Sequence, residues 1–242
     1  MRLRYACILF AAVTALAMAQ SAGDLKRGTR FEPLTYAQLS PLQKAMLTPY
    51  KRIHEAESRA QGKNIPFAVD AQYMANREMS TIYGGVRSPE LTQLMLNAIN
   101  YLRVGAVPRK LHEIAVLMVA RSWTAQYEFQ SHHQHAREAG LSEEIIEAIA
   151  AGKRPAHMQP DEEAVYDFCA ELLATQQVSD KTYAALKSQL GGERGIVELI
   201  GAMAIYDYVS MLHVVDRFPL PDKDCVDGCE FAGKPELQPL RH

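Results

Sequence analysis

Three histidines and a glutamate lie close together in the stretch QYEFQSHHQHAREAG, residues 126–140. At about 100° per residue, a helix places Glu128, His132 and His135 on one stripe, at i, i+4 and i+7. His133 then points roughly 100° away from His132. A glutamate and a histidine one turn apart can share a proton, because the carboxylate favours the imidazolium while burial opposes it. The stretch therefore predicts an acid/base pair formed by Glu128 and His132.

Two other interpretations of this histidine-rich helix stay open at this point. The Glu–His pair can be a structural contact between helices that carries no chemistry. It can also belong to a metal site in which His132 and His135, at i, i+3, supply two ligands. The third ligand would then come from His112, Glu113 or His213. The chain has no H-E-x-x-H or comparable metal motif, so we expect no metal and no cofactor.

The surrounding sequence predicts the helices that must position these side chains. PRKLHEIAVLMVARSW, residues 108–123, is apolar almost all round after Glu113 and is expected to be a core helix. Thr124 is the expected N-cap of the histidine helix and Gly140 the expected residue after its C-cap. No alternating strand pattern competes with these helices, although residues 61–85 are ambiguous and are expected to be irregular. Further helices are expected to begin at Ser40, Ser88 and Ser142, and to cover 161–176, 179–192 and 194–218.

The N-terminal residues have the order of a secretory signal. A basic start, MRLR, precedes the apolar run YACILFAAVTALAMA, which ends in the small-x-small sequence Ala17-Met18-Ala19. We therefore expect a periplasmic or secreted protein, the alternative being an uncleaved anchor helix. No later segment is expected to span a membrane. The predicted organisation is a signal peptide (1–19), an N-terminal arm (20–32), a helical domain (33–220) and a tail (221–242), with arm and tail loosely packed.

The net charge limits the classes of binding partner, and the positions of the cysteines limit their possible roles. The formal net charge is −2 and no Lys/Arg run occurs, so nucleic acids and anionic membrane surfaces are poor candidate partners. Cys169, on the apolar stripe of AVYDFCAELL, is expected to be a buried thiol. Cys225 and Cys229 flank an Asp-Gly turn and could close a small disulfide in an oxidising compartment. A metal or redox role for this pair is weaker, because C-x-x-x-C alone is not a specific signal.

The stretch LHEIAVLMVARSWTAQYEFQSHHQHAREAGLSEEIIEAIAAG, residues 111–152, resembles the core motif of the carboxymuconolactone decarboxylase family. The redox branch of that family, alkylhydroperoxidase D, has a glutamate, then a C-x-x-C, then a histidine. Without a gap, the glutamate falls here at Glu113 and the histidine at His132, while Ala125 and Glu128 replace the cysteines. The resemblance implies an all-α, alkylhydroperoxidase D-like helical fold in a single domain. It also implies a homo-oligomer, a trimer or a multiple of one.

The replaced cysteines decide which chemistry the resemblance implies. Ala125 and Glu128 cannot perform thiol–disulfide exchange, so an antioxidant enzyme of the peroxiredoxin or alkylhydroperoxidase type is disfavoured. The implied enzyme is a cofactor-independent lyase that acts on a small lactone or carboxylated carbonyl compound, by decarboxylation or proton transfer. In it His132 donates the proton and Glu128 orients and charges His132. Glu113 acts as a second proton relay.

Three more side chains are candidates for the wall of a substrate pocket, which are Trp123, Tyr127 and His213. For each of them plain core packing is an equally good explanation. The alternative function, from a different class, is a non-catalytic small-molecule-binding or assembly protein on the same fold.

Overall fold

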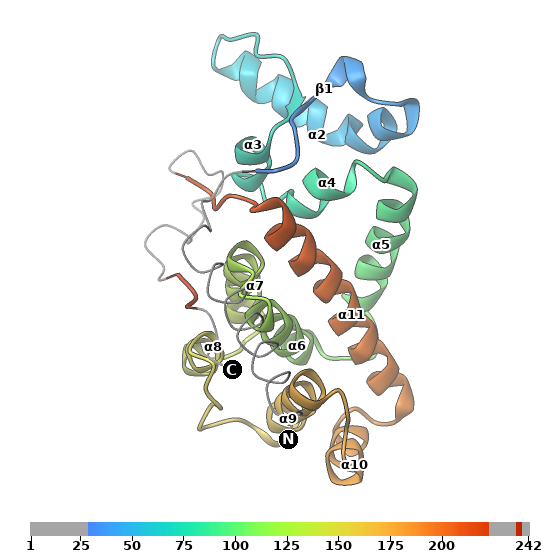
Figure 1. Ribbon diagram of the computed structural model, residues 1–242, viewed down its shortest axis with the longest axis vertical. Helices are drawn as coiled ribbons and strands as arrows, with labels where there is room; N and C mark the ends of the chain where they lie inside the picture. The colour runs from blue at the N-terminus through green and yellow to red at the C-terminus, as the bar shows by residue number, and fades with distance from the viewer. Residues whose placement is uncertain (1–28, 223–235, 239–242) are drawn as a thin grey trace, which may run out of the picture.

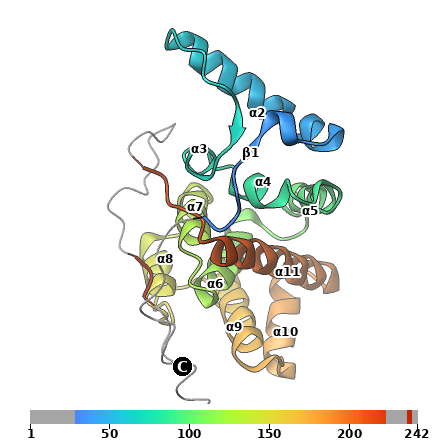
Figure 2. The same ribbon diagram turned by 45° about the horizontal axis from the view of Figure 1, so that its top comes forward.

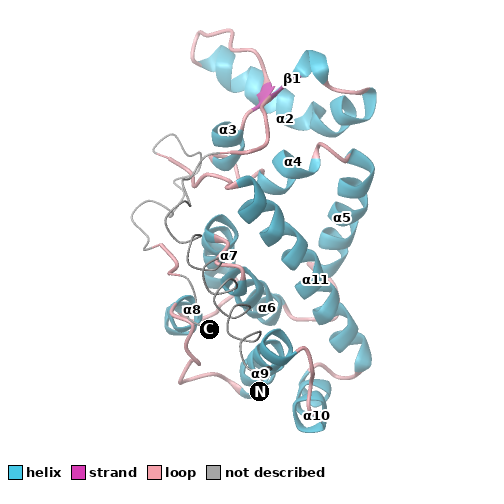
Figure 3. Ribbon diagram, in the orientation of Figure 1, coloured by secondary structure: helices cyan, strands magenta, loops and turns pink. Residues whose placement is uncertain are grey.

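Helix α6 (Arg109–Ser122) lies at the centre of the structure. Its nearly uninterrupted apolar sequence predicted such a core helix. The computed structural model describes residues 29–222 and 236–238, which form one mostly helical domain (Figures 1 and 3). The predicted helical class is therefore confirmed. Four helices pack around α6, which are α7 (Gln126–Glu138), α8 (Glu143–Ala150), α9 (Pro160–Thr175) and α11 (Glu193–Asp216).

The turn between α6 and α7 differs from the predicted one. Thr124, expected to cap α7, has a left-handed backbone with a φ of 52°, and Ala125 precedes the helix without a side-chain cap. The reversal is tight, because the Ala125 amide donates to the carbonyl of Ala120 at 2.9 Å. The prediction for Thr124 was wrong because a residue that reverses the chain in this way cannot also hold the extended conformation of an N-cap.

The end of α7 is formed as predicted. Gly140 follows the C-cap with a φ of 87°, a conformation that favours glycine. The Leu141 amide donates to Ala136 O and the Gly140 amide to Arg137 O, both at 2.9 Å, which is the Schellman pattern of a helix end. Ser142 then caps α8 with its side chain, as expected. The length and phase of α7 are therefore fixed at its C-terminal end.

Two helices in the N-terminal half begin at Ser-Pro pairs. Ser40 caps α2 (Pro41–Ala60) in a capping box with Gln43, which confirms the prediction. Helix α5 (Pro89–Leu102) also begins where expected, but Ser88 makes no side-chain capping hydrogen bond. Near the C-terminal end, α10 (Asp180–Gln189) packs against α9.

Residues 61–85 contain short elements in place of the expected irregular chain. Strands β1 (Leu34–Thr35) and β2 (Ala68–Val69) pair antiparallel, with Leu34 opposite Val69. This small sheet was not predicted, because two-residue strands are too short to show an alternating pattern. The short helices α3 (Ala71–Ala75) and α4 (Ser80–Gly85) lie within residues 61–85, whereas the 3₁₀ helix η1 (Tyr36–Gln38) directly follows β1.

Helix α11 connects the two ends of the domain. Figure 2 shows α2 to α5 on one side of α11 and α9 and α10 on the other. Its 24 residues are long and apolar enough to cross a membrane by composition, a test that a core helix also meets, and half of its most apolar window is buried. We expected no segment after the signal peptide to be long and apolar enough to span a membrane, and α11 is an exception by length and composition.

The ends of the described chain pack against the helices. The backbone amides of Arg30 and Phe31 donate to Asp216 Oδ1 at 3.0 and 2.6 Å. The amide of Leu237 donates to Gln126 Oε1 at 2.6 Å. These parts of the predicted arm and tail are therefore anchored, whereas we expected loose packing.

Cys169 is the one cysteine within the described residues. Cys169 is fully buried and free, as expected. Burial raises the pKa of its thiol to about 12, so it is not a reactive thiolate at neutral pH. The predicted signal peptide and the possible disulfide between Cys225 and Cys229 lie outside the described residues.

Candidate acid–base site

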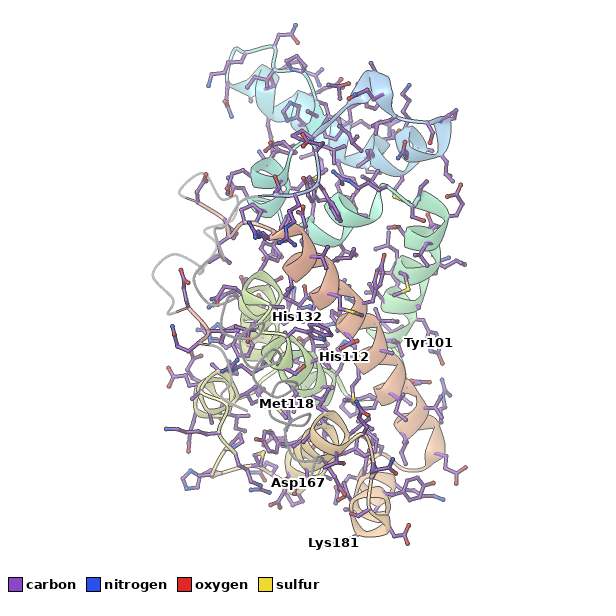
Figure 4. The ribbon with its side chains drawn as sticks, viewed as in Figure 1. Tyr101, His112, Met118, His132, Asp167 and Lys181 are labelled. Atoms are coloured by element: carbon purple, nitrogen blue, oxygen red, sulfur yellow. The ribbon has the colours of Figure 1, made fainter. Side chains whose placement is uncertain are left out.

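Four ionisable side chains from three helices meet where α7 and α11 pack against α6. Glu113 comes from α6, Glu128 and His132 from α7, and His213 from α11, and all four are buried. We call these four residues the acid–base cluster. Figure 4 shows His132 close to His112, the neighbour of Glu113, beside α11. The tight turn at residues 123–125 causes this meeting, because it lays α7 back along α6.

The shortest contact of the cluster joins α6 to α7. His132 Nδ1 lies 2.6 Å from Glu113 Oε2, and Arg109 Nη2 lies 2.7 Å from the other oxygen of Glu113. Burial alone would raise the pKa of Glu113, but the charge and hydrogen bond of His132, with Arg109, lower it to about 2. Glu113 is therefore a carboxylate at neutral pH even though it has no exposed surface.

Glu128 links the two histidines of the cluster. Its Oε1 lies 3.3 Å from His132 Nε2, and its Oε2 lies 3.2 Å from His213 Nδ1. Burial opposes ionisation of Glu128, but the hydrogen bond and charge of His132, with the charge of His213, lower its pKa. The predicted contact between Glu128 and His132 is thus present, and the contact with His213 was not predicted.

His132 lies between two carboxylates and is the centre of the cluster. Burial disfavours the imidazolium, but Glu113, by charge and hydrogen bond, and Glu128 together raise the pKa of His132 well above 6.5. Burial lowers the pKa of His213, which is neutral in consequence. At neutral pH the two carboxylates are therefore balanced by the His132 imidazolium and by Arg109.

The other two histidines of α7 have different surroundings. His133 points to another face, as predicted, where its Nε2 lies 2.8 Å from Glu143 Oε1. The His135 ring lies 5.3 Å from the His132 ring in an edge-to-face contact, and burial and the charge of His132 lower its pKa. Within residues 29–222 and 236–238, no group of three or more His, Cys, Asp or Glu side chains is arranged to hold a metal ion.

The three predicted wall residues do not share one location. Tyr127 is buried against the cluster, with its ring 5.2 Å from that of His213 and its hydroxyl donating to Ala75 O at 3.2 Å. His213 is part of the cluster itself. Trp123 is 39% exposed, and its indole N–H donates to Asp207. The structure therefore joins Tyr127 and His213 to the site and leaves Trp123 at the surface.

Two polar residues of α11 at this junction were missed from the sequence. Tyr206 and Ser210 are buried at 3% and 0% exposure, and the Tyr206 ring lies 4.7 Å from the His132 ring. With His213 they occupy positions i, i+4 and i+7 of a mostly apolar helix face. This spacing is visible in the sequence, but it indicates a shared site only when the structure shows that α11 lies against α7.

The comparisons with other proteins add no family to this geometry. Neither a scan against protein-family models nor a search of curated proteins gives a significant match to the chain. Function is therefore inferred from the acid–base cluster and from the motif resemblance.

Proposed function

We propose that the protein is a cofactor-independent acid–base enzyme of the carboxymuconolactone decarboxylase type, with the alkylhydroperoxidase D-like arrangement of helices. Its substrate is a small lactone or a carboxylated carbonyl compound, and its reaction is decarboxylation or proton transfer. One observation supports this most strongly: His132 lies between Glu113 and Glu128, at the positions where the family motif has its histidine, its glutamate and its second cysteine. A buried, charged imidazole flanked by two carboxylates is suited to deliver a proton.

The two sides of the His132 ring have different roles in the proposed reaction. Nδ1 is held by Glu113 at 2.6 Å, whereas Nε2 is 3.3 Å from Glu128 and is the more available donor. Loss of CO2 from the substrate carboxylate leaves an electron pair delocalised into the conjugated carbonyl as a dienolate. His132 then donates its Nε2 proton to carbon and becomes neutral. A proton from solvent restores the imidazolium, so each turnover consumes one proton.

Activity screening tests this proposal. The purified protein should release CO2 from, or exchange a carbon-bound proton of, a carboxylated γ-lactone or a β-keto acid without added cofactor. Peroxide with a dithiol reductant serves as the control, and we expect negligible reduction of peroxide because Ala125 and Glu128 replace the cysteines. A robust, cysteine-dependent reduction of peroxide would contradict the proposed chemistry.

We also propose that the protein is a homo-oligomer, as the family resemblance implies. Large apolar side chains are exposed along α5 and α11, which pack side by side, and such surfaces commonly mark contacts between proteins. Light scattering should give a mass several times that of the chain, and a monomer at micromolar concentration would contradict this. The exposed side chains are Leu91, Leu94, Tyr101, Val197, Ile200, Met211, Val214 and Val215.

Export to the periplasm or the medium is proposed from the signal-like N-terminus. N-terminal sequencing of the exported form should begin near Gln20, after the Ala17-Met18-Ala19 sequence. Recovery of the intact chain, starting at Met1, from the cytoplasm would show that the segment is not a cleaved signal.

A second candidate function, ligand binding without turnover, is favoured by a cavity on the other face of α7. The cavity has a volume of about 430 Å³ and lies between α6, α7, α8 and residues 236–238. Its lining combines apolar Phe129, Ile146 and Leu237 with polar His133 and Arg121. A ligand that co-purifies and is lost in His133→Ala, but retained in His132→Gln, would support this function over catalysis.

A further inference from the structure

Three buried polar side chains on one face of α11, at or beside the acid–base cluster, carry atoms that have no hydrogen-bond partner among the described residues. Their unpaired atoms are the Tyr206 hydroxyl, the Ser210 hydroxyl and both ring nitrogens of His213. The His213 Nδ1 is 3.2 Å from Glu128, but the angle is not that of a hydrogen bond. We call Tyr206, Ser210 and His213 the α11 polar stripe. Buried polar groups in folded proteins are nearly always paired, so three neighbours without partners require an explanation.

The stripe lies directly opposite the charged residues of α6 and α7. The Tyr206 ring makes edge-to-face contacts with His132 at 4.7 Å and with His112 at 5.6 Å. His213 lies at the other end of the stripe, beside Glu128. The Ser210 hydroxyl comes from the helical turn between them, and its residue has no exposed surface. The three helices therefore enclose one polar junction, with charges on one side and neutral groups on the other.

Core packing does not account for the two hydroxyls. Phenylalanine at position 206 and alanine at position 210 would occupy nearly the same space without leaving a polar atom unpaired. Burying an unpaired hydroxyl disfavours the folded state. Buried polar groups without a protein partner occur at catalytic sites and where a bound water or ion completes their hydrogen bonds.

The charges of the acid–base cluster indicate which kind of substrate oxygen the α11 polar stripe can bind. The carboxylates of the cluster are balanced by His132 and Arg109, so the site is close to neutral before a substrate enters. Oxygen that becomes negative during a reaction is stabilised best by neutral donors fixed in place beforehand. The buried Tyr206, whose ring contacts the proton donor His132, and the buried Ser210, one helical turn along the same face of α11, can supply such donors.

We propose that Tyr206 and Ser210 form an oxyanion-binding subsite, in which both hydroxyls donate to the carbonyl oxygen of the substrate as it becomes an enolate or dienolate. This rests on the proposed function and narrows its substrate class. The substrate must carry a carbonyl oxygen conjugated to the carbon that loses CO2 and gains the His132 proton. When the reaction occurs, the electron pair released at that carbon is delocalised onto the oxygen held by the two hydroxyls.

The test uses 4-nitrophenol, a planar ring whose oxyanion form is coloured and resembles a conjugated enolate. The full-length protein should bind the phenolate, and Tyr206→Phe and Ser210→Ala should each weaken that binding about ten- to a hundred-fold. Tyr208→Phe is the matched control, because residue 208 lies on a different face of α11, and it should bind like the unmodified protein. The melting temperatures of the Tyr206 and Ser210 variants should stay equal or rise, since each loses an unpaired buried hydroxyl.

The outcomes separate the subsite from the proposed reaction. Absence of phenolate binding, unchanged binding in both variants, or a lowered melting temperature in both would overturn the subsite. Turnover that depends on His132 but not on Tyr206 or Ser210 would also overturn it and leave the proposed function standing. Phenolate binding that needs both hydroxyls, in a protein whose His132→Gln variant keeps full turnover, would support the subsite and refute the role of His132.

Discussion

Replacing His132 should abolish turnover of the substrate, with a loss on the order of 10²–10⁴-fold, because a positioned proton donor is removed. His132→Ala would also leave Glu113 and Glu128 without their shared cation. Removing one partner of a buried ion pair reduces the free energy of unfolding by about 3–5 kcal/mol. His132→Gln is therefore the better variant, since its amide can still donate to Glu113 while it cannot deliver a proton. Steady-state kinetics with circular dichroism would separate lost chemistry from lost structure.

Two further histidine variants serve as controls for this loss. His133→Ala should leave turnover nearly unchanged, because His133 contacts Glu143 on another face of α7. His135→Ala should have a modest effect, because His135 meets His132 only through an edge-to-face ring contact. A metal site that used both His132 and His135 would lose activity with either substitution and with a chelator. Equal damage from His133→Ala and His132→Gln would refute the assignment.

Glu113→Gln should be the most destabilising conservative change in the cluster. The carboxylate of Glu113 is fully buried and contacts both His132, at 2.6 Å, and Arg109, at 2.7 Å. Its loss leaves Arg109 without its carboxylate partner and His132 with Glu128 as its remaining counter-ion, and the free energy of unfolding should fall by about 3–5 kcal/mol. Glu128→Gln should cost less, since its contacts with the two histidines are 3.3 and 3.2 Å long. Urea unfolding of both variants would measure the difference.

The pH dependence of stability follows from the same contacts. The pKa of Glu113 is lowered from 4.5 to about 2 in the folded protein. Its contribution is present above pH 4.5 and is lost as the pH falls toward 2. The pKa of His132 is raised above 6.5, so its contribution is complete below pH 6.5 and is lost as the pH rises through the folded value. Stability from this pair should therefore be greatest between pH 4.5 and 6.5, and Glu113→Gln should flatten the profile.

One control variant tests whether this effect arises at the Glu113–His132 pair. Glu143→Gln removes the carboxylate that pairs with His133 at the edge of the domain. It should leave the pH profile of stability almost unchanged, because exposed ion pairs contribute little. A profile that responds equally to Glu143→Gln and Glu113→Gln would show that the Glu113–His132 pair is not the cause.

The sequence predicted those parts of the site that depend on local geometry. The contact between Glu128 and His132 follows from one helical turn, and the Schellman end at Gly140 follows from a glycine with positive φ. Glu113 was identified from the spacing of a motif, and the structure places it nearer to His132 than Glu128 is. The fold class was predictable for the same reason, since helices with a regular apolar periodicity dominate the chain.

Contacts over long sequence distances could not be predicted. The pairing of Glu128 with His213, and the stripe of Tyr206 and Ser210, depend on how α11 crosses α7. The sequence shows that α11 is apolar but not which of its faces meets α7. Trp123 was a candidate wall residue of the site, yet it ends α6 at the surface. Side chains on one helix are related by its period, whereas side chains on different helices are related only by packing.

The protonation state of His132 tests the central claim most directly. Long-range proton–nitrogen NMR spectra of the ¹⁵N-labelled protein distinguish an imidazolium from either neutral tautomer, and no substrate is required. The proposed site predicts that His132 is an imidazolium at pH 7 and loses its proton only well above the ordinary pKa of 6.5, and that Glu113→Gln lowers this pKa. A neutral His132 at pH 7, or a pKa unaffected by Glu113→Gln, would contradict the claim that the two carboxylates hold a charged proton donor between them.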